Sequence, residues 1–278
     1  MTAHAGENAR FRDVIDGPCT MRWSPNVVRF VVTFALNSEF AAWRRIAGFK
    51  KAGCTGIPVY SMRSGETEVC AAITGIGTRS VKSELRDLFR SGADVCIASG
   101  LAGSLRGHAA GTIVAARSVR GEAHRKELKT DDSLVEIARQ CGAVPVDCFF
   151  TSDTVVNSRS EKSCLGRIAD AVEMESFQIL RQAAEHGIPS IAVRAVSDAA
   201  ETELPIDFNQ VIDERGQIAW LAALRQAART PQRMPEWIRF GRDSARARRN
   251  LAHFLDGYIQ RVASSSDLRW AAARAGFK

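Results

Sequence analysis

The chain is 278 residues long, 45% hydrophobic and 25% charged, with a formal net charge of +7. This composition excludes an intrinsically disordered chain and supplies enough apolar residues for one sizeable core. The longest apolar run, residues 27–36, is interrupted by Arg29 and Thr33 and falls short of the roughly 20 residues that a membrane-spanning helix needs.

The positive charge is concentrated near the C-terminus. Five arginines fall within residues 239–250: Arg239, Arg242, Arg246, Arg248 and Arg249. We interpret this run as a solvated helix face, which is the usual role of such a run. There are three alternative roles for these arginines: binding of nucleic acid, formation of a subunit interface, and binding of acidic lipid headgroups in a peripheral membrane contact. Nucleic acid is disfavoured because the charge is local.

The chain shows no secretion signal and no metal-binding pattern. Its N-terminal residues are partly acidic and include no apolar segment before a small-residue cleavage site, so we expect a cytoplasmic protein. The seven cysteines have no C-x-x-C spacing and their number is odd, which favours reduced thiols over a disulfide framework. The five histidines are isolated from one another. We therefore expect no metal and no cofactor.

Strand-like and helix-like patterns alternate along the chain. Residues 27–36 are rich in β-branched side chains, and residues 39–49 place Phe40, Trp43 and Ile46 on one helical face. In chain order the predicted elements are strand 27–36, helix 39–49, strand 66–73, turn 74–77, helix 80–89, strand 94–98, glycine-rich loop 99–105, strand 111–115, helix 132–141, strand 144–150, helix 171–187 and strand 190–196. From about residue 208 onward the pattern is helical.

This alternation predicts the fold class and the domain organisation. Strands that alternate with helices form a mostly parallel sheet with helices on both faces. Because no internal repeat or low-complexity tract divides the chain, we predict a single α/β domain over residues 26–225. A flexible lead at 1–25 would precede it, and a helical, arginine-rich extension at 226–278 would follow it.

Polar side chains cluster at the ends of the predicted strands. Glu39 follows the first strand, the glycine-rich segment 99–105 follows another, Ser197 and Asp198 follow the last, and Glu-Met-Glu occupies 173–175. Taken singly, these clusters could be surface charge, tight turns, a helix cap or carboxylates at a helix start. Ligands of open α/β sheets bind outside the carboxyl ends of the strands, so the combination predicts one shared crevice.

Two segments carry a family resemblance. VEMES at 172–176 and VRAVSDAAE at 193–201 resemble the signature of the methylthioadenosine/S-adenosylhomocysteine nucleosidases and, more broadly, of the nucleoside phosphorylase superfamily. TGIG at 74–77, SGLAGSL at 99–105 and AAGTIV at 109–114 match the family's glycine segments in the same order. The resemblance implies a single-domain three-layer fold with a central mixed, mostly parallel, twisted sheet flanked by helices. It also implies a homodimer that cleaves the N-glycosidic bond of a purine, adenosine-type nucleoside.

The resemblance implies catalytic roles for four side chains. Cleavage of a ribosidic bond passes through a cationic sugar, so the site must activate the leaving base and stabilise positive charge on the ribose. Asp198 would donate a proton at N7 of the purine as general acid, with Ser197 holding its geometry. Arg194 and Glu39 would position the nucleophile beneath the anomeric carbon.

The same resemblance implies a set of substrate-binding residues. Glu175 would bind the ribose hydroxyls, and Met174 would pack against the sugar. The other residues expected in this set are Glu173, Ala102, Gly103, Val155 and Val156. The two valines fall where the family has its base-contacting loop, and the aromatic residue that is common there is missing.

The acceptor is the point at which this chain departs from the phosphorylases. Those enzymes hold phosphate with an arginine and a hydroxyl around the glycine segment, where this chain has Ala98 and Leu101. Water is therefore the preferred acceptor, although Arg79 or Arg106 could approach from other positions and hold inorganic phosphate.

Two alternatives remain open from the sequence. The segment from residue 203 onward resembles the hopanoid-associated phosphorylases, which favours a phosphorylase that acts on a lipid-linked or other 5′-modified nucleoside. A non-catalytic protein that binds nucleic acid or a membrane through its C-terminal arginines, on a degenerate enzyme fold, is the alternative of another class.

Overall fold

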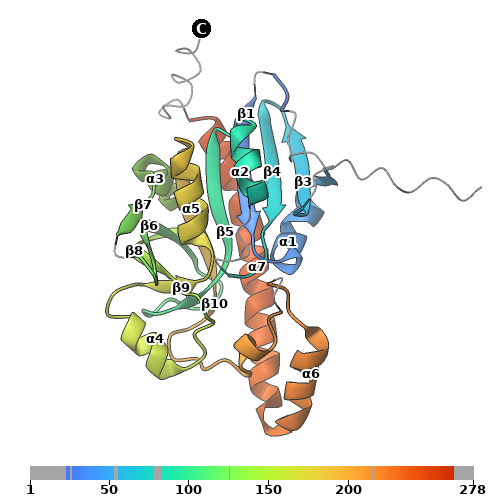
Figure 1. Ribbon diagram of the computed structural model, residues 1–278, viewed down its shortest axis with the longest axis vertical. Coiled ribbons are helices and arrows are strands. Elements are labelled where there is room, and N and C mark those ends of the chain that lie inside the picture. Colours follow the sequence, from blue (N-terminus) through green and yellow to red (C-terminus); the bar gives the residue numbers. More distant parts are fainter. Residues whose placement is uncertain are drawn as a thin grey trace, which may run out of the picture.

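The fold is built on one mixed β-sheet with helices on both faces (Figure 1). The computed structural model describes residues 23–25, 27–52, 56–77, 83–124, 126–213 and 216–265. The strands are β1 (Val28–Phe34), β2 (Lys50–Lys51), β3 (Val59–Ser64), β4 (Thr67–Ile73), β5 (Val95–Ser104), β6 (Ile113–Gly121), β7 (Glu127–Lys129), β8 (Val144–Thr151), β9 (Ala171–Glu173) and β10 (Ser190–Asp198). The helices are α1 (Asn37–Ala47), α2 (Ser83–Arg90), α3 (Asp132–Gln140), α4 (Arg159–Leu165), α5 (Ser176–Glu185), α6 (Trp220–Arg229) and α7 (Met234–Ala263).

Half of the sheet closes on itself. Strand β10 pairs with both β5 and β6, so that β5, β9, β8, β6 and β10 form a ring, and β1, β4, β3 and β2 extend from β5 as an open sheet. The β1–β4, β1–β5, β5–β10 and β6–β8 pairings are parallel, whereas β3 pairs with β4 antiparallel. The predicted mixed sheet between helices is confirmed.

Strand β1 shows how the core is divided between the two faces of the sheet. Phe30, Val32 and Phe34 pack in a cluster with α1, α3 and α7, whereas Val31 belongs to the cluster with α2 and α5. Successive side chains of a strand point to opposite faces. Because both faces are covered by helices, both sets of side chains are mostly apolar, and only Arg29 and Thr33 interrupt the apolar run of β1.

The glycine-rich segment is mostly strand, and the prediction of a loop over 99–105 is wrong. Strand β5 continues to Ser104. Gly100 is paired with Arg194 of β10, and Gly103 with Val172 of β9. Glycine has a low intrinsic preference for strands, but partners on both sides supply hydrogen bonds to the backbone and keep the segment extended.

The predicted helix at 171–187 begins later than expected. Residues Ala171–Glu173 form β9, which pairs with β5 and β8, and α5 starts at Ser176. The local pattern is compatible with a helix, and only the neighbouring strands make the extended form favourable. Of the other predicted segments, the helix at 80–89 is described from Ser83 onward as α2, and the lead at 1–25 lies outside the described residues except at 23–25.

The C-terminal helix α7 belongs to the core for half of its length. Leu251, Leu255, Tyr258 and Val262 are buried in the cluster that contains β1 and α1, and the Tyr258 hydroxyl donates to the carbonyl of Leu134 at 2.9 Å. The first half of α7 runs beside α6 away from the sheet, at the bottom of Figure 1. Among the described residues, no helix combines the length and the apolar composition needed to cross a membrane.

We expect Leu255→Ala to destabilise the protein by about 2–5 kcal/mol, because it leaves a cavity in a filled core. Leu255 is fully buried, whereas Leu221 of α6 is 72% exposed. Leu221→Ala is therefore the matched control, with an expected change within about 0.5 kcal/mol. Urea unfolding measures both changes, and equal effects of the two substitutions would contradict the packing of α7 against the sheet.

Candidate active site

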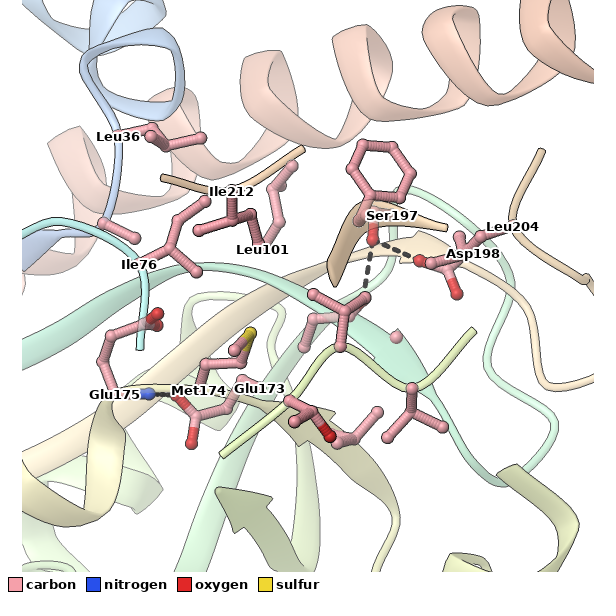
Figure 2. Close-up of a pocket in the computed structure, with 18 of the residues that line it drawn as sticks. Leu36, Ile76, Leu101, Glu173, Met174, Glu175, Ser197, Asp198, Leu204 and Ile212 are labelled. Carbon is pink, nitrogen blue, oxygen red and sulfur yellow. Dashed lines mark hydrogen bonds between the residues drawn. The ribbon is translucent and has the colours of Figure 1, made fainter. Parts of the chain in front are cut away.

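A cavity of about 190 Å³ lies at the ends of β1, β5, β9 and β10. The predicted residues that line it are Glu39, Ala102, Gly103, Val155, Val156, Glu173, Met174, Glu175, Ser197 and Asp198. The strand-end clusters of the sequence therefore lie in one crevice. Figure 2 shows Glu175 and the Ser197–Asp198 pair on opposite sides of this cavity, with Met174 between them.

Arg194 lies behind the cavity and not in its wall. Its side chain is 1% exposed. Nη2 donates to Glu173, to Glu175 Oε2 at 3.4 Å and to Ser176 Oγ at 2.9 Å, and Nη1 donates to the carbonyl of Ser99 at 3.0 Å. Burial opposes the charge of the guanidinium, but the neighbouring carboxylates outweigh that effect and raise the pKa of Arg194. Arg194 is thus a fixed cation around which the carboxylates are arranged.

The carboxylate of Glu173 is saturated by protein donors. It accepts hydrogen bonds from the amides of Glu175 at 2.9 Å and Ser176 at 2.8 Å, from the Thr151 hydroxyl and from Arg194. These bonds join the end of β9 to the start of α5. Glu173 therefore orients the residues that follow it, and Glu175 presents its own carboxyl group to the cavity.

Glu39 and Glu175 are the other two carboxyl groups that lie near Arg194, and both line the cavity. Glu39 accepts hydrogen bonds from the amides of Ala35, Leu36 and Leu101 at 3.0–3.1 Å. Burial, opposed in part by Arg194 and these amides, raises the pKa of Glu39. Burial, with Arg194 acting against it and Glu173 in support, raises the pKa of Glu175 to about 8. One arginine therefore faces three carboxyl groups, Glu39, Glu173 and Glu175.

Two glycines of β5 make room for these groups. Gly100 has φ +145°, and a Cβ there would stand 2.4 Å from Arg194 Nη1 and 3.2 Å from both oxygens of Glu39. A Cβ on Gly103 would stand 3.1 Å from Asp198 Oδ2. The glycine segment therefore allows charged side chains of α1 and β10 to approach the backbone of β5.

Asp198 is held by a hydroxyl on one oxygen and by a lysine on the other. Its Oδ1 accepts from Ser197 Oγ at 2.5 Å, and its Oδ2 accepts from Lys162 Nζ at 2.5 Å. Lys162 belongs to α4 and is fully buried. Lys162 was not predicted from the sequence. The capping pair Ser158 and Glu161 at the start of α4 is exposed, and nothing local marks Lys162 as buried. Only the fold brings α4 to the end of β10.

The rest of the cavity wall is apolar. Leu36, Ile76, Leu101 and Ile212 gather on one side in Figure 2. Phe208 and Phe240, which were not predicted from the sequence, also line the cavity with Val155 and Val156, and their ring centroids are 5.5 Å apart. Phe208 follows β10, and Phe240 belongs to α7.

Of the positions considered for phosphate, Ala98 and Arg106 do not line the cavity, whereas Leu101 does. Ala98 is buried in the core, and Leu101 contributes only an apolar surface. Arg106 donates to Asp170 and to the carbonyl of Gly166. Arg79 lies outside the described residues.

Comparison with known proteins agrees with this architecture. A family described as the phosphorylase superfamily matches residues 30–227. The chain superposes on a futalosine hydrolase mutant of Helicobacter pylori strain 26695 with a TM-score of 0.65 at 16% identity, over 84% of this chain and 99% of that one. It superposes on the 5′-methylthioadenosine/S-adenosyl homocysteine nucleosidase of Campylobacter jejuni with a TM-score of 0.65 at 16% identity, over 86% of this chain and 100% of that one. At this identity the structural likeness shows a common fold.

The family match covers most of the chain, and the strand ends that form the crevice lie within it. This favours the enzymatic interpretations over a non-catalytic basic protein. The chain belongs to the phosphorylase superfamily.

Proposed function

We propose that this enzyme releases the free base from a purine, adenosine-type nucleoside and that water is the preferred acceptor. The observation that carries the proposal is the polarity of the cavity. A carboxyl group suited to the leaving base, Asp198, stands on one side, and the carboxyl group of Glu175 stands on the other. Glu39 lines the same cavity and accepts from the amides of Ala35, Leu36 and Leu101. A ribosidic bond between the two sides would have an acid at the base and negative charge at the sugar.

Asp198 acts on the base. When the N-glycosidic bond breaks, its electron pair passes to the purine, and protonation at N7 turns the base into a neutral leaving group. A carboxyl group that is 7% exposed meets little competition from water for this proton transfer. Ser197 donates to Oδ1 and sets the orientation of the carboxyl plane.

Glu175 and Met174 act on the sugar. In its ionised form Glu175 accepts hydrogen bonds from the ribose hydroxyls and stabilises the positive charge that develops on the ring. Arg194 holds Glu175 from behind, and the amide of Gly77 holds it at 2.8 Å. Glu39 then orients the attacking water beneath the anomeric carbon and takes up its proton.

Phosphorolysis is the second candidate, and one residue favours it. Arg248 of α7 is half-buried, and its guanidinium forms no ion pair with any carboxylate in the described part of the chain. Burial lowers the pKa of Arg248, and the charge of Glu39 acts in the opposite direction, so the two groups lie close enough to interact. An arginine there could hold a phosphate dianion. Water asks for no such counter-charge, and it remains our preferred acceptor.

The apolar wall supports a nucleoside with an apolar 5′ substituent. Leu36, Ile76 and Ile212 lie on the same side of the cavity as Glu175, where the sugar would bind. A methylthio group or a longer chain would bury apolar surface against them. Phe208 and Phe240 extend this wall into the C-terminal segment, which keeps the lipid-linked nucleoside as an alternative. Homodimer formation, cytoplasmic location and peripheral membrane contact stay predictions.

Asp198→Asn should lower the rate of base release by about 10² to 10⁴-fold, because the amide keeps the shape of the side chain and cannot supply the proton. Nucleoside binding should change little. Steady-state kinetics with adenosine and methylthioadenosine measure the effect, and the exposed Asp147 provides the control Asp147→Asn. Near-normal turnover by Asp198→Asn would remove Asp198 from the mechanism.

Glu175→Gln should lower kcat by about tenfold or more and change KM less, since the carboxylate of Glu175 acts mainly on the cationic sugar.

The substitution should also alter the pH dependence of stability. The pKa of Glu175 is about 8 in the folded protein, whereas the ordinary pKa of a glutamate is 4.5. Between these values the folded state binds the extra proton, so the free energy of unfolding falls as pH rises, by up to about 1.4 kcal/mol per pH unit.

This slope should be smaller in Glu175→Gln and unchanged in the exposed control Glu185→Gln. Urea unfolding between pH 5 and pH 8 measures it. Identical slopes in the wild-type protein and Glu175→Gln would show that the carboxyl group of Glu175 ionises normally in the folded state.

Base release should proceed in phosphate-free buffer and yield free ribose or its 5′-modified form. Added phosphate should not raise the rate, and Arg248→Gln should hydrolyse the nucleoside about as fast as Arg242→Gln, its exposed control on α7. Chromatography of the sugar product makes the measurement. Strict dependence on phosphate, with ribose 1-phosphate as the product and a raised KM for phosphate in Arg248→Gln, would establish the second candidate instead.

A further inference from the structure

Lys162 is a buried cation with every donor satisfied. Its side chain is 0% exposed. Nζ donates to Asp198 Oδ2 at 2.5 Å, to the carbonyl of Thr202 at 2.7 Å and to the carbonyl of Ala199 at 3.0 Å. An ammonium group has three donors and no acceptor, and all three are used here. The geometry is that of a charged lysine.

This ion pair is poorly explained by stability alone. Removing an ammonium and a carboxylate from water costs free energy that their attraction often does not return, and apolar residues of similar volume are frequently as stable. Because Asp198 is the side chain assigned to acid catalysis, we look for a role of its partner Lys162 in that step.

The contact with Lys162 constrains one oxygen of Asp198. Oδ2 accepts from the ammonium of Lys162, which can only donate. Ser197 Oγ lies 2.5 Å from Oδ1 and 3.1 Å from the carbonyl of Ala102, and its single proton serves one of them at a time. The Lys162 contact therefore suits the carboxylate that Asp198 becomes after a proton has left it.

We infer that Lys162 is the positioning residue of the general acid, and that it stabilises the carboxylate which Asp198 becomes when its proton passes to the leaving base. The inference rests on the proposed function. In the step itself, the N-glycosidic bond breaks, its electron pair stays with the purine, and the proton of Asp198 moves to N7. The products are a neutral base, a ribosyl cation that the acceptor captures, and an Asp198 carboxylate paired with Lys162.

Other charged groups lie near Asp198 but do not replace Lys162. A neighbouring charged cavity shares Asp198 and Ser197 with Arg159, Glu201, Glu203, Arg233, Glu236, Arg239 and Asp243. Glu39, Glu173 and Glu175 face it from the main cavity. In the described part of the chain, the ion pair with Lys162 is the one that Asp198 makes. Lys162 also ties α4 to the segment after β10, so the test must separate charge from architecture.

Lys162→Gln removes the charge and keeps two N–H donors for the carbonyls of Ala199 and Thr202. Without the ammonium, the carboxylate that forms on Asp198 has lost its counter-charge. The rate of base release from adenosine should therefore fall, and the decline of the rate at high pH should move upward by about one pH unit or more. Lys162→Arg keeps the charge and should keep the wild-type profile. Lys129→Met, which removes an exposed lysine of β7, is the control.

A second substrate isolates the proton. The aryl leaving group of 4-nitrophenyl riboside departs without protonation, so its cleavage should be insensitive to Lys162→Gln and to Asp198→Asn. The ratio of the two rates in one preparation is independent of how much of the protein is folded. A variant that loses both activities equally, with the wild-type pH profile, would make Lys162 merely structural and overturn the inference. If the wild type does not accept the aryl riboside, the pH profile decides.

Should Lys162→Gln not fold, the neutral pair Lys162→Gln/Asp198→Asn replaces it. A lysine that acts through Asp198 adds no loss to that of Asp198→Asn, and a further loss in the double variant overturns the inference. Failure of the proposed function looks different: a folded wild-type enzyme would release no base from any purine nucleoside, and the inference would fall with it. An active wild type with an unchanged profile in Lys162→Gln overturns the inference alone.

Discussion

The buried guanidinium of Arg194 organises the whole site. It is almost fully excluded from water and donates to Glu173, Glu175, Ser176 and the backbone of β5. Breaking a buried charge pair leaves an uncompensated charge, which is costly. Moving a carboxyl group away from Arg194 would therefore cost free energy, which keeps each of these groups in place. The site is preorganised before a substrate binds.

The architecture of the sheet serves this arrangement. β10 lies beside β5 in parallel register, so Arg194 stands opposite Gly100, and the missing side chain leaves space for the guanidinium and for Glu39. The same device recurs further along β5, where Gly103 makes space for Asp198. The glycines that look like loop residues in the sequence are positions of close approach within a strand.

The buried carboxyl groups on the two sides of the cavity have different charged partners. On the side of Glu175, one arginine is shared among three carboxyl groups, and burial raises the pKa of Glu175 and of Glu39. On the other side, Asp198 has a lysine on one oxygen and a hydroxyl beside the other. The environments of paired carboxyl groups commonly separate their roles in this way. The C-terminal helix completes the cavity with Phe240 and closes the core with its second half.

The class of fold, the family and the members of the strand-end clusters could all be predicted from the sequence. Mostly apolar runs such as β1 mark strands buried on both faces, and short signatures such as VEMES with VRAVSD are readable as motifs because they are local. All of the predicted side chains except Arg194 line one cavity. Arg194 holds that cavity from behind, a distinction that depends on which face of β10 is covered.

The remaining features depend on contacts between distant parts of the chain. Whether residues 99–104 and 171–173 are strands depends on hydrogen bonds to segments far away in the sequence, and local propensity cannot supply that information. The partnership of Lys162 with Asp198, across 36 positions of sequence, arises because α4 packs at the end of β10. Phe208 and Phe240 enter the cavity for the same reason. A side chain acquires its chemistry from its neighbours, and the neighbours are set by the fold.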